Sequence, residues 1–365
     1  MTTKEKKETF ENAINDSINK TEDINDIIGF IEIEKISRKL KETAKSLTPN
    51  EARYLTDAKI QIQNFRIRIQ NQLRACKQEY DEDNVVNNNI LEWLFNSIFT
   101  IEKEIIKALD IYTSASKAGR WIKSNLGIGP VLAAGLLANF DVTKCTYAGQ
   151  FWSYAGLNDN NIEWLGASKS SDIVDSVIGK SRKITEENLQ EIAKLTGRSY
   201  TKIHDMAYDE KKGKYDKKSL KNNLAKLPYN AQLKSLCYLI GGQFMRLKHN
   251  NKSLYAKLFF DRLAYETKKN DEGKNKDYAD MMLKKYKYDK NKDTYKSLEQ
   301  GKLSKAHLVA RARRYTVKIF ISHLFEALYY FEYNKKAPEP YIFSHGDKGS
   351  HYDYIAPEVD YLNFE

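Results

Sequence analysis

The sequence predicts a mostly α-helical protein, a multi-helix chain with a helix-hairpin-helix core and a long N-terminal helical hairpin. Only six prolines occur in 365 residues, and few segments show the alternation of apolar and polar residues that is typical of strands. Several long stretches instead repeat apolar residues at steps of three and four, which is the period of an amphipathic helix. A chain of this length is expected to form about two or three domains with an ample core.

Changes in composition divide the chain into five parts. We predict a helical scaffold over 1–117, a helix-hairpin-helix over 118–157, a basic inserted subdomain over 158–228, a helical domain that packs on the hairpin region over 229–334, and an extended tail over 335–365. The tail is rich in proline and tyrosine and is expected to wrap over the surface.

The N-terminal scaffold is predicted to start with two polar helices within residues 1–46, and then shows a strong helix start at Thr48-Pro49-Asn50-Glu51. Threonine caps the helix, proline takes the first helical position and glutamate closes the capping box. Two apolar stripes follow, one of Tyr54, Ala58, Ile62, Phe65, Ile69, Leu73 and Cys76, and one of Leu91, Leu94, Ile98, Ile101, Ile105 and Leu109. Arg66 lies off the first stripe. We expect an antiparallel helical hairpin or part of a coiled coil, and residues 49–117 are a possible homodimer contact.

A glycine hairpin, Leu126-Gly127-Ile128-Gly129-Pro130, separates a helix that ends at Trp121-Ile122 from an apolar helix that begins at Val131. Glycine permits the left-handed backbone that such a turn needs. The turn would point free backbone N–H groups outward at the start of the second helix, where they form a ready site for a nucleic-acid phosphate. We therefore name Gly127, Ile128, Gly129 and Val131 as candidate nucleic-acid-binding residues. The alternative is a plain turn between two core helices.

The inserted subdomain carries a cluster of lysines, Lys211, Lys212, Lys214, Lys217, Lys218 and Lys221, and a segment with helix-turn-helix spacing. In that segment Ala193 would lie at the helix crossing, Gly197 would make the turn and Ile203 would anchor the second helix. Thr185 offers an N-cap. Residues near the start of the second helix would face DNA, namely Tyr200, Thr201, Lys202 and His204. Many helical hairpins that do not bind DNA share this pattern, so that interpretation stays open.

The last strong helix is predicted over roughly 303–333. One side carries the apolar residues Leu308, Ala312, Tyr315, Ile319 and Ser322. Another side carries a basic ridge of His307, Arg311, Arg314 and Lys318 at steps of four and three. A basic ridge behind an apolar stripe suits phosphate contact, and a solvated helix face is the alternative.

The composition limits the classes of partner. The formal net charge is +11, with 60 Lys and Arg against 49 Asp and Glu; this charge favours a polyanionic partner, although a lysine-rich surface is a simpler explanation of part of it. No apolar run is long enough to span a membrane, and no secretion signal is visible. No P-loop or dinucleotide fingerprint occurs, so we predict no cofactor. His345, Asp347, His351 and Asp353 could ligate a metal, but a surface loop is favoured and we predict no metal site.

Three segments carry a family resemblance through their order along the chain: Gly127-Ile128-Gly129-Pro130, Tyr154-Ala155-Gly156-Leu157, and a helix start at Asn230 with Leu233-Lys234. Together they resemble the C-terminal half of the Piv/MooV-type insertion-sequence transposases (the one-ten group). That half has a helix-hairpin-helix with a Gly-Ile-Gly-Pro core, a Tyr-x-Gly-Leu segment, and a helix that opens with Gly-Asn. Tyr229 stands where the family has the glycine.

The resemblance also implies features that this chain lacks or alters. The family's first half is a RuvC-like nuclease domain with acidic metal ligands on a β-sheet, whereas residues 1–117 are predicted to be helical and offer no such strand. The family further implies a nucleophilic serine soon after Tyr-x-Gly-Leu. Ser168, Ser170 and Ser171 occupy that stretch and could be nucleophiles beside Lys169, or could cap a helix.

We therefore expect a DNA-binding protein of a mobile element or phage, in the cytoplasm of a bacterial or phage-infected cell. It would resemble the DNA-holding half of a transposase or recombinase and bind DNA, including branched DNA or DNA with a structured RNA. One alternative is an active transposase or site-specific recombinase that uses a serine near 168–171, with a nuclease partner in trans. Another is a structural, self-associating helical protein.

Overall fold

The computed structural model describes residues 35–79, 89–158, 163–179, 183–210, 212–338 and 354–364. Over these residues the protein has fifteen α-helices, two short 3-10 helices and one two-stranded hairpin, so the predicted mostly-α fold is confirmed. The helices form two compact units, α3 to α7 and α8 to α17. The helices predicted before residue 35 lie outside the described residues.

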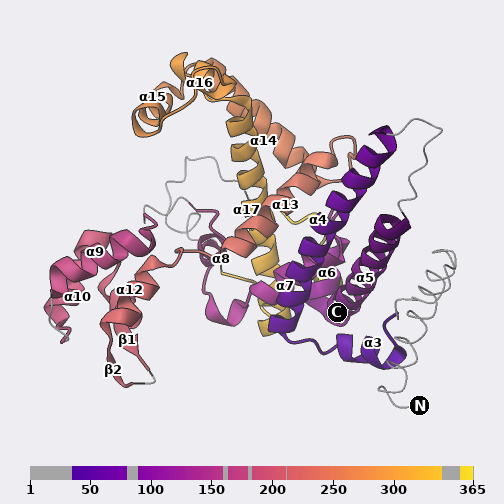
Figure 1. Cartoon of the computed structure of the whole chain (residues 1–365), viewed down its shortest axis with the longest axis horizontal. Coiled ribbons are helices and arrows are strands. Elements are labelled where there is room, and N and C mark those ends of the chain that lie inside the picture. Colours follow the sequence, from indigo (N-terminus) through magenta and orange to yellow (C-terminus); the bar gives the residue numbers. More distant parts are fainter. Residues whose placement is uncertain are drawn as a thin grey trace. The chain divides into compact units, whose positions relative to one another are not determined.

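The first unit contains the predicted helical hairpin. Helices α4 (Pro49–Glu79) and α5 (Asn89–Ser114) pack along each other in opposite directions, and α3 (Arg38–Ala44) packs on α5 (Figure 1). The capping box at the start of α4 is present, because Thr48 N donates to Glu51 Oε2 at 2.7 Å and Glu51 N donates to Thr48 Oγ1 at 3.3 Å. The expected antiparallel hairpin is therefore confirmed.

The buried face of α4 differs from the predicted stripe. Tyr54 is 75% exposed and Phe65 is 41% exposed, so their assignment to the core was wrong. Lys59 and Arg66 lie at the interface instead, with Lys59 Nζ 3.5 Å and Arg66 Nε 2.6 Å from the buried carboxylate of Glu102 on α5. A buried ion pair that is well hydrogen-bonded offsets much of the cost of removing both charges from water. Apolar spacing alone could not reveal this pairing.

Two further helices complete the first unit, α6 (Lys117–Ser124) and α7 (Pro130–Asn139). Helix α7 packs against α4 and α5, and its interior face is formed by the small and apolar residues Ala133, Ala134, Gly135, Leu136 and Ala138. The prediction of two helices joined by a glycine turn is confirmed. These helices pack with the N-terminal scaffold, whereas the sequence analysis assigned them to a separate segment over 118–157.

The second unit is organised around the long helix α17 (Lys305–Tyr333). Helices α8 (Ala148–Tyr154), α13 (Ala231–Arg246) and α14 (Leu254–Asp271) pack against it, and η1 (Val142–Lys144) precedes α8. Three aromatic rings meet in this core, with centroid separations of 4.9 Å for Phe244–Tyr255, 5.1 Å for Tyr255–Phe320 and 5.5 Å for Phe244–Phe320. The observed α17 agrees with the helix predicted over 303–333.

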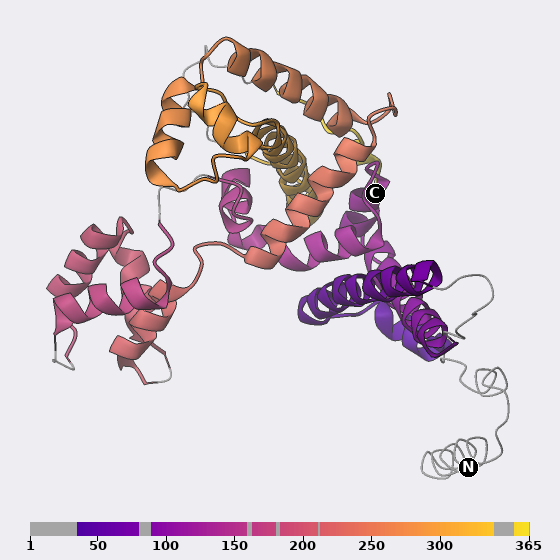
Figure 2. The ribbon, with the colours of Figure 1, turned by 45° about the horizontal axis from the view of Figure 1, so that its top comes forward.

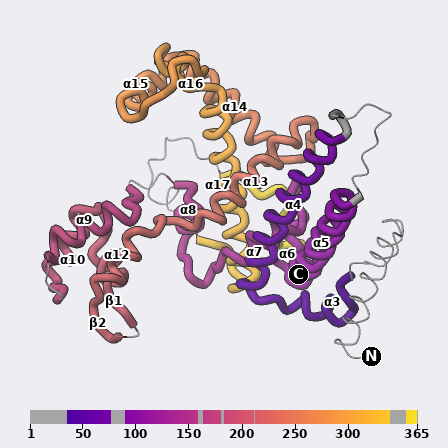
Figure 3. The backbone as a smooth tube through the Cα atoms, in the orientation of Figure 1, coloured from indigo at the N-terminus to yellow at the C-terminus, as the bar shows by residue number. Residues whose placement is uncertain are grey.

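Helices α15 (Lys276–Lys285) and α16 (Asp293–Glu299) lie between α14 and α17 in the chain and at one end of both helices (Figure 3). A small apolar cluster of Ala279, Leu298, Leu303 and Leu308 holds them to the start of α17. The C-terminal segment ends in η2 (Tyr361–Asn363).

Four helices of the second unit form a small bundle with its own apolar core (Figure 2). They are α9 (Gly166–Ile178), α10 (Glu186–Thr196), α11 (Tyr200–Ala207) and α12 (Lys217–Ala225). An antiparallel hairpin joins α11 to α12, with β1 (Tyr208–Asp209) paired to β2 (Lys214–Tyr215). This bundle corresponds to the subdomain predicted over 158–228, which we call the α9–α12 bundle.

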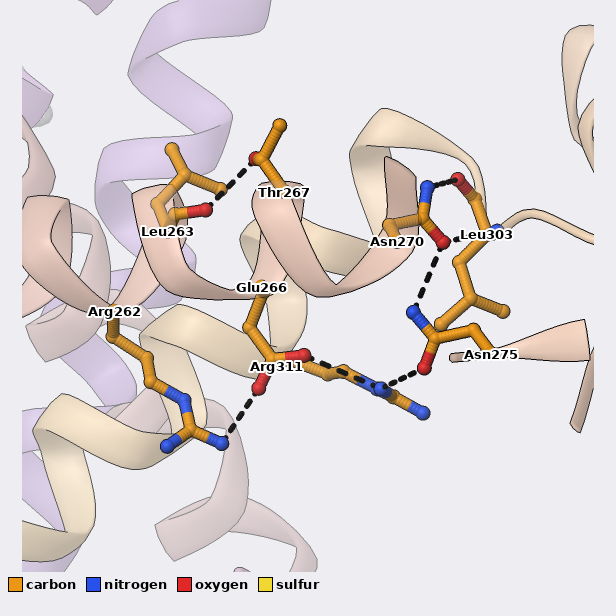
Figure 4. A network of polar contacts seen from close by, with 8 residues as sticks. All are labelled: Arg262, Leu263, Glu266, Thr267, Asn270, Asn275, Leu303 and Arg311. Carbon is orange, nitrogen blue, oxygen red and sulfur yellow. Dashed lines mark hydrogen bonds and ion pairs between the residues drawn. The ribbon is translucent and has the colours of Figure 1, made fainter. Parts of the chain in front are cut away.

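A buried polar network connects α14, α15 and α17 (Figure 4). Glu266 is 2% exposed and lies 2.6 Å from Arg262 Nη2 and 3.3 Å from Arg311 Nη1. Arg311 Nη1 also donates to Asn275 Oδ1 at 3.1 Å, and Asn275 Nδ2 donates to Asn270 Oδ1 at 3.0 Å. Asn270 also exchanges two hydrogen bonds with the backbone of Leu303. The network therefore fixes the loop before α17 to the end of α14.

A buried histidine connects the C-terminal segment to the core of the second unit. His323 on α17 is 2% exposed; its Nδ1 lies 2.9 Å from the hydroxyl of Tyr255, and its Nε2 lies 2.7 Å from the carbonyl of Ile355. The carbonyl can only accept, so Nε2 donates to it and the Tyr255 hydroxyl donates to Nδ1. Burial lowers the pKa of His323 to about 4, although the hydrogen bond to Ile355 acts in the opposite direction.

Glu266→Gln should lower the free energy of unfolding by about 2–4 kcal/mol, because it leaves two arginines without their buried anion. Both arginines retain some contact with water, which keeps the loss below that of a fully buried pair. Urea denaturation measures the effect. The control is Glu272→Gln, which removes an exposed carboxylate paired with Lys274 and should leave the midpoint unchanged. Equal midpoints for the two variants would contradict the structural role of the network.

His323 should make stability depend on pH between about 7 and 4. The unfolded imidazole takes up a proton near pH 6.5 and the folded one only near pH 4, so the unfolded state binds more protons in this window. The free energy of unfolding should therefore fall as pH falls, by at most about 1.4 kcal/mol per pH unit from this group. Urea denaturation at several pH values should show that His323→Gln removes this component, whereas His249→Gln, at an exposed position, retains it. Parallel pH profiles for wild type and His323→Gln would contradict the account.

Candidate nucleic-acid interface

The glycine hairpin has the backbone that the sequence predicted. Gly127 has φ of +89°, and both Gly127 and Gly129 are exposed, whereas Ile128 is buried. A Cβ at Gly127 would lie 3.1 Å from Leu247 Cδ1, while a Cβ at Gly129 would meet no atom within 4 Å. Gly127 is therefore needed for the turn itself, and Gly129 leaves open space beside the start of α7.

A carboxylate of the protein itself binds the backbone amide that precedes the glycine turn. Leu126 N donates to Glu358 Oε1 at 3.2 Å, and Leu254 N, at the first position of α14, donates to Glu358 Oε2 at 2.8 Å. The sequence analysis missed Glu358, and only its long-range contacts reveal it. A phosphate at this hairpin would have to use the amides at the start of α7, which have no intrahelical acceptor. Val131 belongs to that first turn and is half-buried.

The predicted helix-turn-helix spacing is observed in α10 and α11. Thr185 caps α10 through a capping box with Asn188, and Gly197 ends it with φ of +63°. Ala193 and Ile203 are buried in the bundle core, as the spacing required. Lys202 is exposed in the first turn of α11. The local geometry is thus confirmed, while contact with DNA bases stays a prediction.

An aromatic row follows one face of α11 and continues onto the β-hairpin. The ring of His204 lies 6.1 Å from Tyr200, 6.3 Å from Tyr208 and 5.3 Å from Tyr215, measured between centroids. Tyr200 and Tyr208 are more than one-third exposed. Tyr200 and His204 were predicted from the sequence to lie near DNA, whereas Tyr208 and Tyr215 were not, because they join the row through the β-hairpin that follows α11. Exposed aromatic rings of this kind can stack with bases.

Three lysines of the cluster in the bundle form ion pairs with carboxylates of the same bundle. Lys212 lies 3.1 Å from Asp209 and 3.3 Å from Asp216. Lys217 and Lys221 both pair with Asp175, at 2.8 Å and 2.5 Å, and their hydrogen bonds hold the pKa of that carboxyl well below its usual range. Lys211 lies outside the described residues. The cluster therefore offers less free positive charge than its sequence suggests.

Two residues of the basic ridge on α17 also make contacts within the fold. Arg311 belongs to the Glu266 network, and Lys318 Nζ lies 5.3 Å from the ring centroid of Trp152. His307 is partly buried, which together with the charges of Arg311 and Arg314 lowers its pKa. Arg314 is exposed. Of the ridge residues, Arg314 is therefore the most accessible to a phosphate, while Arg311 has a structural role.

The three serines proposed as nucleophiles lie on α9 in different environments. Ser170 is fully buried and its hydroxyl has no hydrogen-bond partner, so it is inaccessible to a DNA phosphate and its assignment as a nucleophile was wrong. Ser171 Oγ donates to Asp175 Oδ2 at 3.1 Å, and Ser168 is exposed. Lys169, expected to assist an attacking serine, instead pairs with Glu163 at 3.0 Å. Among the described residues around α9, these contacts do not pair an accessible serine with a free general base.

Two of the ordered sequence motifs meet in space. Asn230 N donates to the carbonyl of Tyr154 at 2.9 Å, and Asn230 Nδ2 donates to the Tyr154 hydroxyl at 3.1 Å. Gly156 has φ of +64°, and a Cβ there would lie 2.7 Å from the ring of Tyr229. Tyr229 thus covers Gly156. The Nζ of Lys234 lies 4.2 Å from the centroid of the Tyr229 ring. These motifs stabilise the joint between α8 and α13.

Comparison with protein-family models, with curated proteins and with solved structures finds no match to this chain. Among the described residues, no group of three or more His, Cys, Asp or Glu side chains is placed to hold a metal ion. The metal-ligand pattern at 345–353 lies outside them. No helix in the described part of the chain is long and apolar enough to cross a membrane.

Gly127→Ala should lower the free energy of unfolding by about 1–2 kcal/mol, because an alanine at positive φ is strained and its Cβ crowds Leu247. Gly129→Ala is the matched control: it adds the same methyl group in the same turn, into open space. Thermal or urea unfolding measures both. If the two variants lose equal stability, the turn does not depend on the left-handed residue.

Proposed function

We propose that this chain is a DNA-binding protein of a mobile element or phage, acting in the cytoplasm of a bacterial or phage-infected cell. It holds DNA through backbone phosphates and resembles the DNA-holding half of the Piv/MooV-type transposases. The observation that carries the proposal is the exposed glycine turn at the start of α7, with open space beside Gly129. Helix-start amides and the positive end of the helix dipole favour a phosphate there.

Two further observations support this proposal. The α10–turn–α11 element has the spacing of a helix-turn-helix and exposes Lys202 and an aromatic row on its second helix. The contact between Tyr154 and Asn230 gives a spatial basis to the ordered motifs on which the family resemblance depends. Phosphate contacts at the hairpin and at Arg314 would add affinity without sequence preference, and α11 would supply base contacts. Branched DNA, or DNA with a structured RNA, belongs to the same ligand class.

An active serine recombinase is less well supported. Ser170 is buried, and Ser171 is bonded to a carboxylate whose charge two lysines already balance. Within the described part of the chain, the exposed Ser168 has no hydrogen bond to a general base. Covalent trapping on nicked DNA would test this alternative. A covalent adduct that forms with the wild type and not with Ser168→Ala would support it.

Self-association is a second candidate function that one observation favours. Helix α4 exposes Tyr54 and Phe65, at 75% and 41%, and these two residues lie on the same helix face, three turns apart. Exposed apolar side chains along a long helix suit a helix-to-helix contact with a second copy through residues 49–117. Sedimentation of the wild type and of Tyr54→Ser/Phe65→Ser tests it: a dimer that the double variant disrupts supports the contact, and a wild-type monomer at high concentration rejects it.

Binding to a DNA duplex, a single strand and a branched junction across salt concentrations tests the proposed function. Affinity should fall steeply with salt, with a slope on logarithmic axes of about 0.9 for each duplex phosphate contacted. Absence of binding at low salt, or binding that does not change with salt, would reject phosphate contact.

Gly129→Val should weaken binding to every DNA sequence alike, because its side chain fills the open space beside the helix-start amides. It should leave the unfolding midpoint unchanged, since a Cβ there meets no atom within 4 Å. Gly149→Val is a matched control near the start of α8, where a Cβ also meets open space. Fluorescence anisotropy with unrelated duplexes measures the effect, and wild-type affinity in Gly129→Val would show that the hairpin is only structural.

A further inference from the structure

The α9–α12 bundle contains an open pocket with an excess of positive charge. It has a volume of about 370 Å³ and is lined in part by Arg198, Lys202, Asp205, Asn223 and Lys226. Arg198 follows Gly197 in the turn between α10 and α11, Lys202 belongs to the first turn of α11, and Lys226 ends α12. Three cations therefore line one pocket with one carboxylate.

Arg198 is unusual because it is buried without a carboxylate. The residue is 6% exposed, and its guanidinium donates to two backbone carbonyls, Thr196 at 3.4 Å and Glu163 at 3.3 Å. Within the described residues no acidic side chain lies at ion-pair distance from it. Burial lowers the pKa of the guanidinium, which nevertheless stays protonated at neutral pH.

A buried cation without an anion is strongly unfavourable. Lys59 and Arg66, the cations packed between α4 and α5, by contrast share the carboxylate of Glu102. A guanidinium carries five N–H donors, and two carbonyls at long distances use only part of them. An anionic ligand in the pocket would supply both the missing charge and the missing acceptors.

The neighbouring side chains favour the same class of ligand. Lys202 and Lys226 are exposed at the pocket, and Lys226 Nζ donates to Asn223 Oδ1 at 2.8 Å. The single carboxylate, Asp205, lies 3.4 Å from His204 Nδ1. The aromatic row begins with Tyr200 and His204 on the same short helix and continues with Tyr208 at the start of β1. A strand of nucleic acid presents phosphates and bases at neighbouring positions, which matches a basic pocket beside exposed rings.

We propose that this pocket binds a backbone phosphate of a nucleic-acid strand, with Arg198 as the central ligand and Lys202 and Lys226 at its sides. The planar guanidinium can donate to two phosphate oxygens at once. The proposal rests on the proposed function and adds a second, separate phosphate site to the glycine hairpin.

The experiment measures salt-dependent binding of a DNA duplex and a DNA single strand to the full chain. Arg198→Gln, Lys202→Gln and Lys226→Gln should each weaken binding about tenfold at low salt, and each should reduce the duplex salt slope by about 0.9. Lys194→Gln removes the same charge from an exposed position on α10 and should bind as the wild type does. The two exposed lysine variants keep the test valid if Arg198→Gln fails to fold.

A second arm separates the pocket from the proposed function. Inorganic phosphate or pyrophosphate, added at constant ionic strength against chloride, should raise the thermal midpoint of the wild type and not that of Arg198→Gln or Lys202→Gln. Salt-dependent DNA binding that is unchanged in all three pocket variants overturns the pocket and leaves the proposed function in place. Anion stabilisation without DNA binding overturns the proposed function and the nucleic-acid ligand, and leaves only an anion pocket.

Discussion

Internal charge pairing decides which cations of this basic chain remain for a partner. The chain has 60 basic and 49 acidic residues, for a formal net charge of +11, and many of the basic residues pair with carboxylates within the fold. Glu102 holds two cations between α4 and α5, Glu266 holds two arginines between α14 and α17, and Asp175 holds two lysines in the α9–α12 bundle. Removing Glu102 or Glu266, which are buried, would leave two cations together in a region of low dielectric constant, so the contacts of these helices depend on the carboxylates.

The same pairing changes the functional argument. A cation with a carboxylate partner must give up that contact before it can bind a phosphate, whereas an unpaired cation is ready to bind. Arg311 and Lys212 are therefore weaker candidates for phosphate ligands than the sequence suggested. Lys202 and Arg314 are exposed and remain candidates. Arg198 differs from these four residues because it is buried and yet pairs with no acidic side chain in the described part of the chain. Glu358 illustrates the converse case, since its carboxylate accepts a hydrogen bond from the amide of Leu126, next to the turn that was predicted to bind phosphate.

Local signals in the sequence predicted the fold well. The capping box at Thr48, the glycine turn at 127 and the turn at Gly197 each depend on a few neighbouring residues, so their chemistry can be recognised without the structure. The sequence could not predict which face of α4 is buried, because that face is set by Glu102 on another helix. Glu358 escaped prediction for the same reason, since it contacts residues more than a hundred positions away. The sequence places Arg198 directly after the predicted turn glycine, Gly197, but the burial of Arg198 depends on the packing of the whole bundle.

The central claim is that unpaired positive charge and exposed helix-start amides hold nucleic-acid phosphates. The most direct test is the dependence of duplex affinity on salt concentration, measured for the wild type and for a variant that joins Gly129→Val to Lys202→Gln. The account predicts a steep wild-type slope that becomes shallower in the variant, together with a lower affinity for every duplex sequence. A wild-type affinity that does not respond to salt, or an unchanged slope in the folded variant, would contradict it.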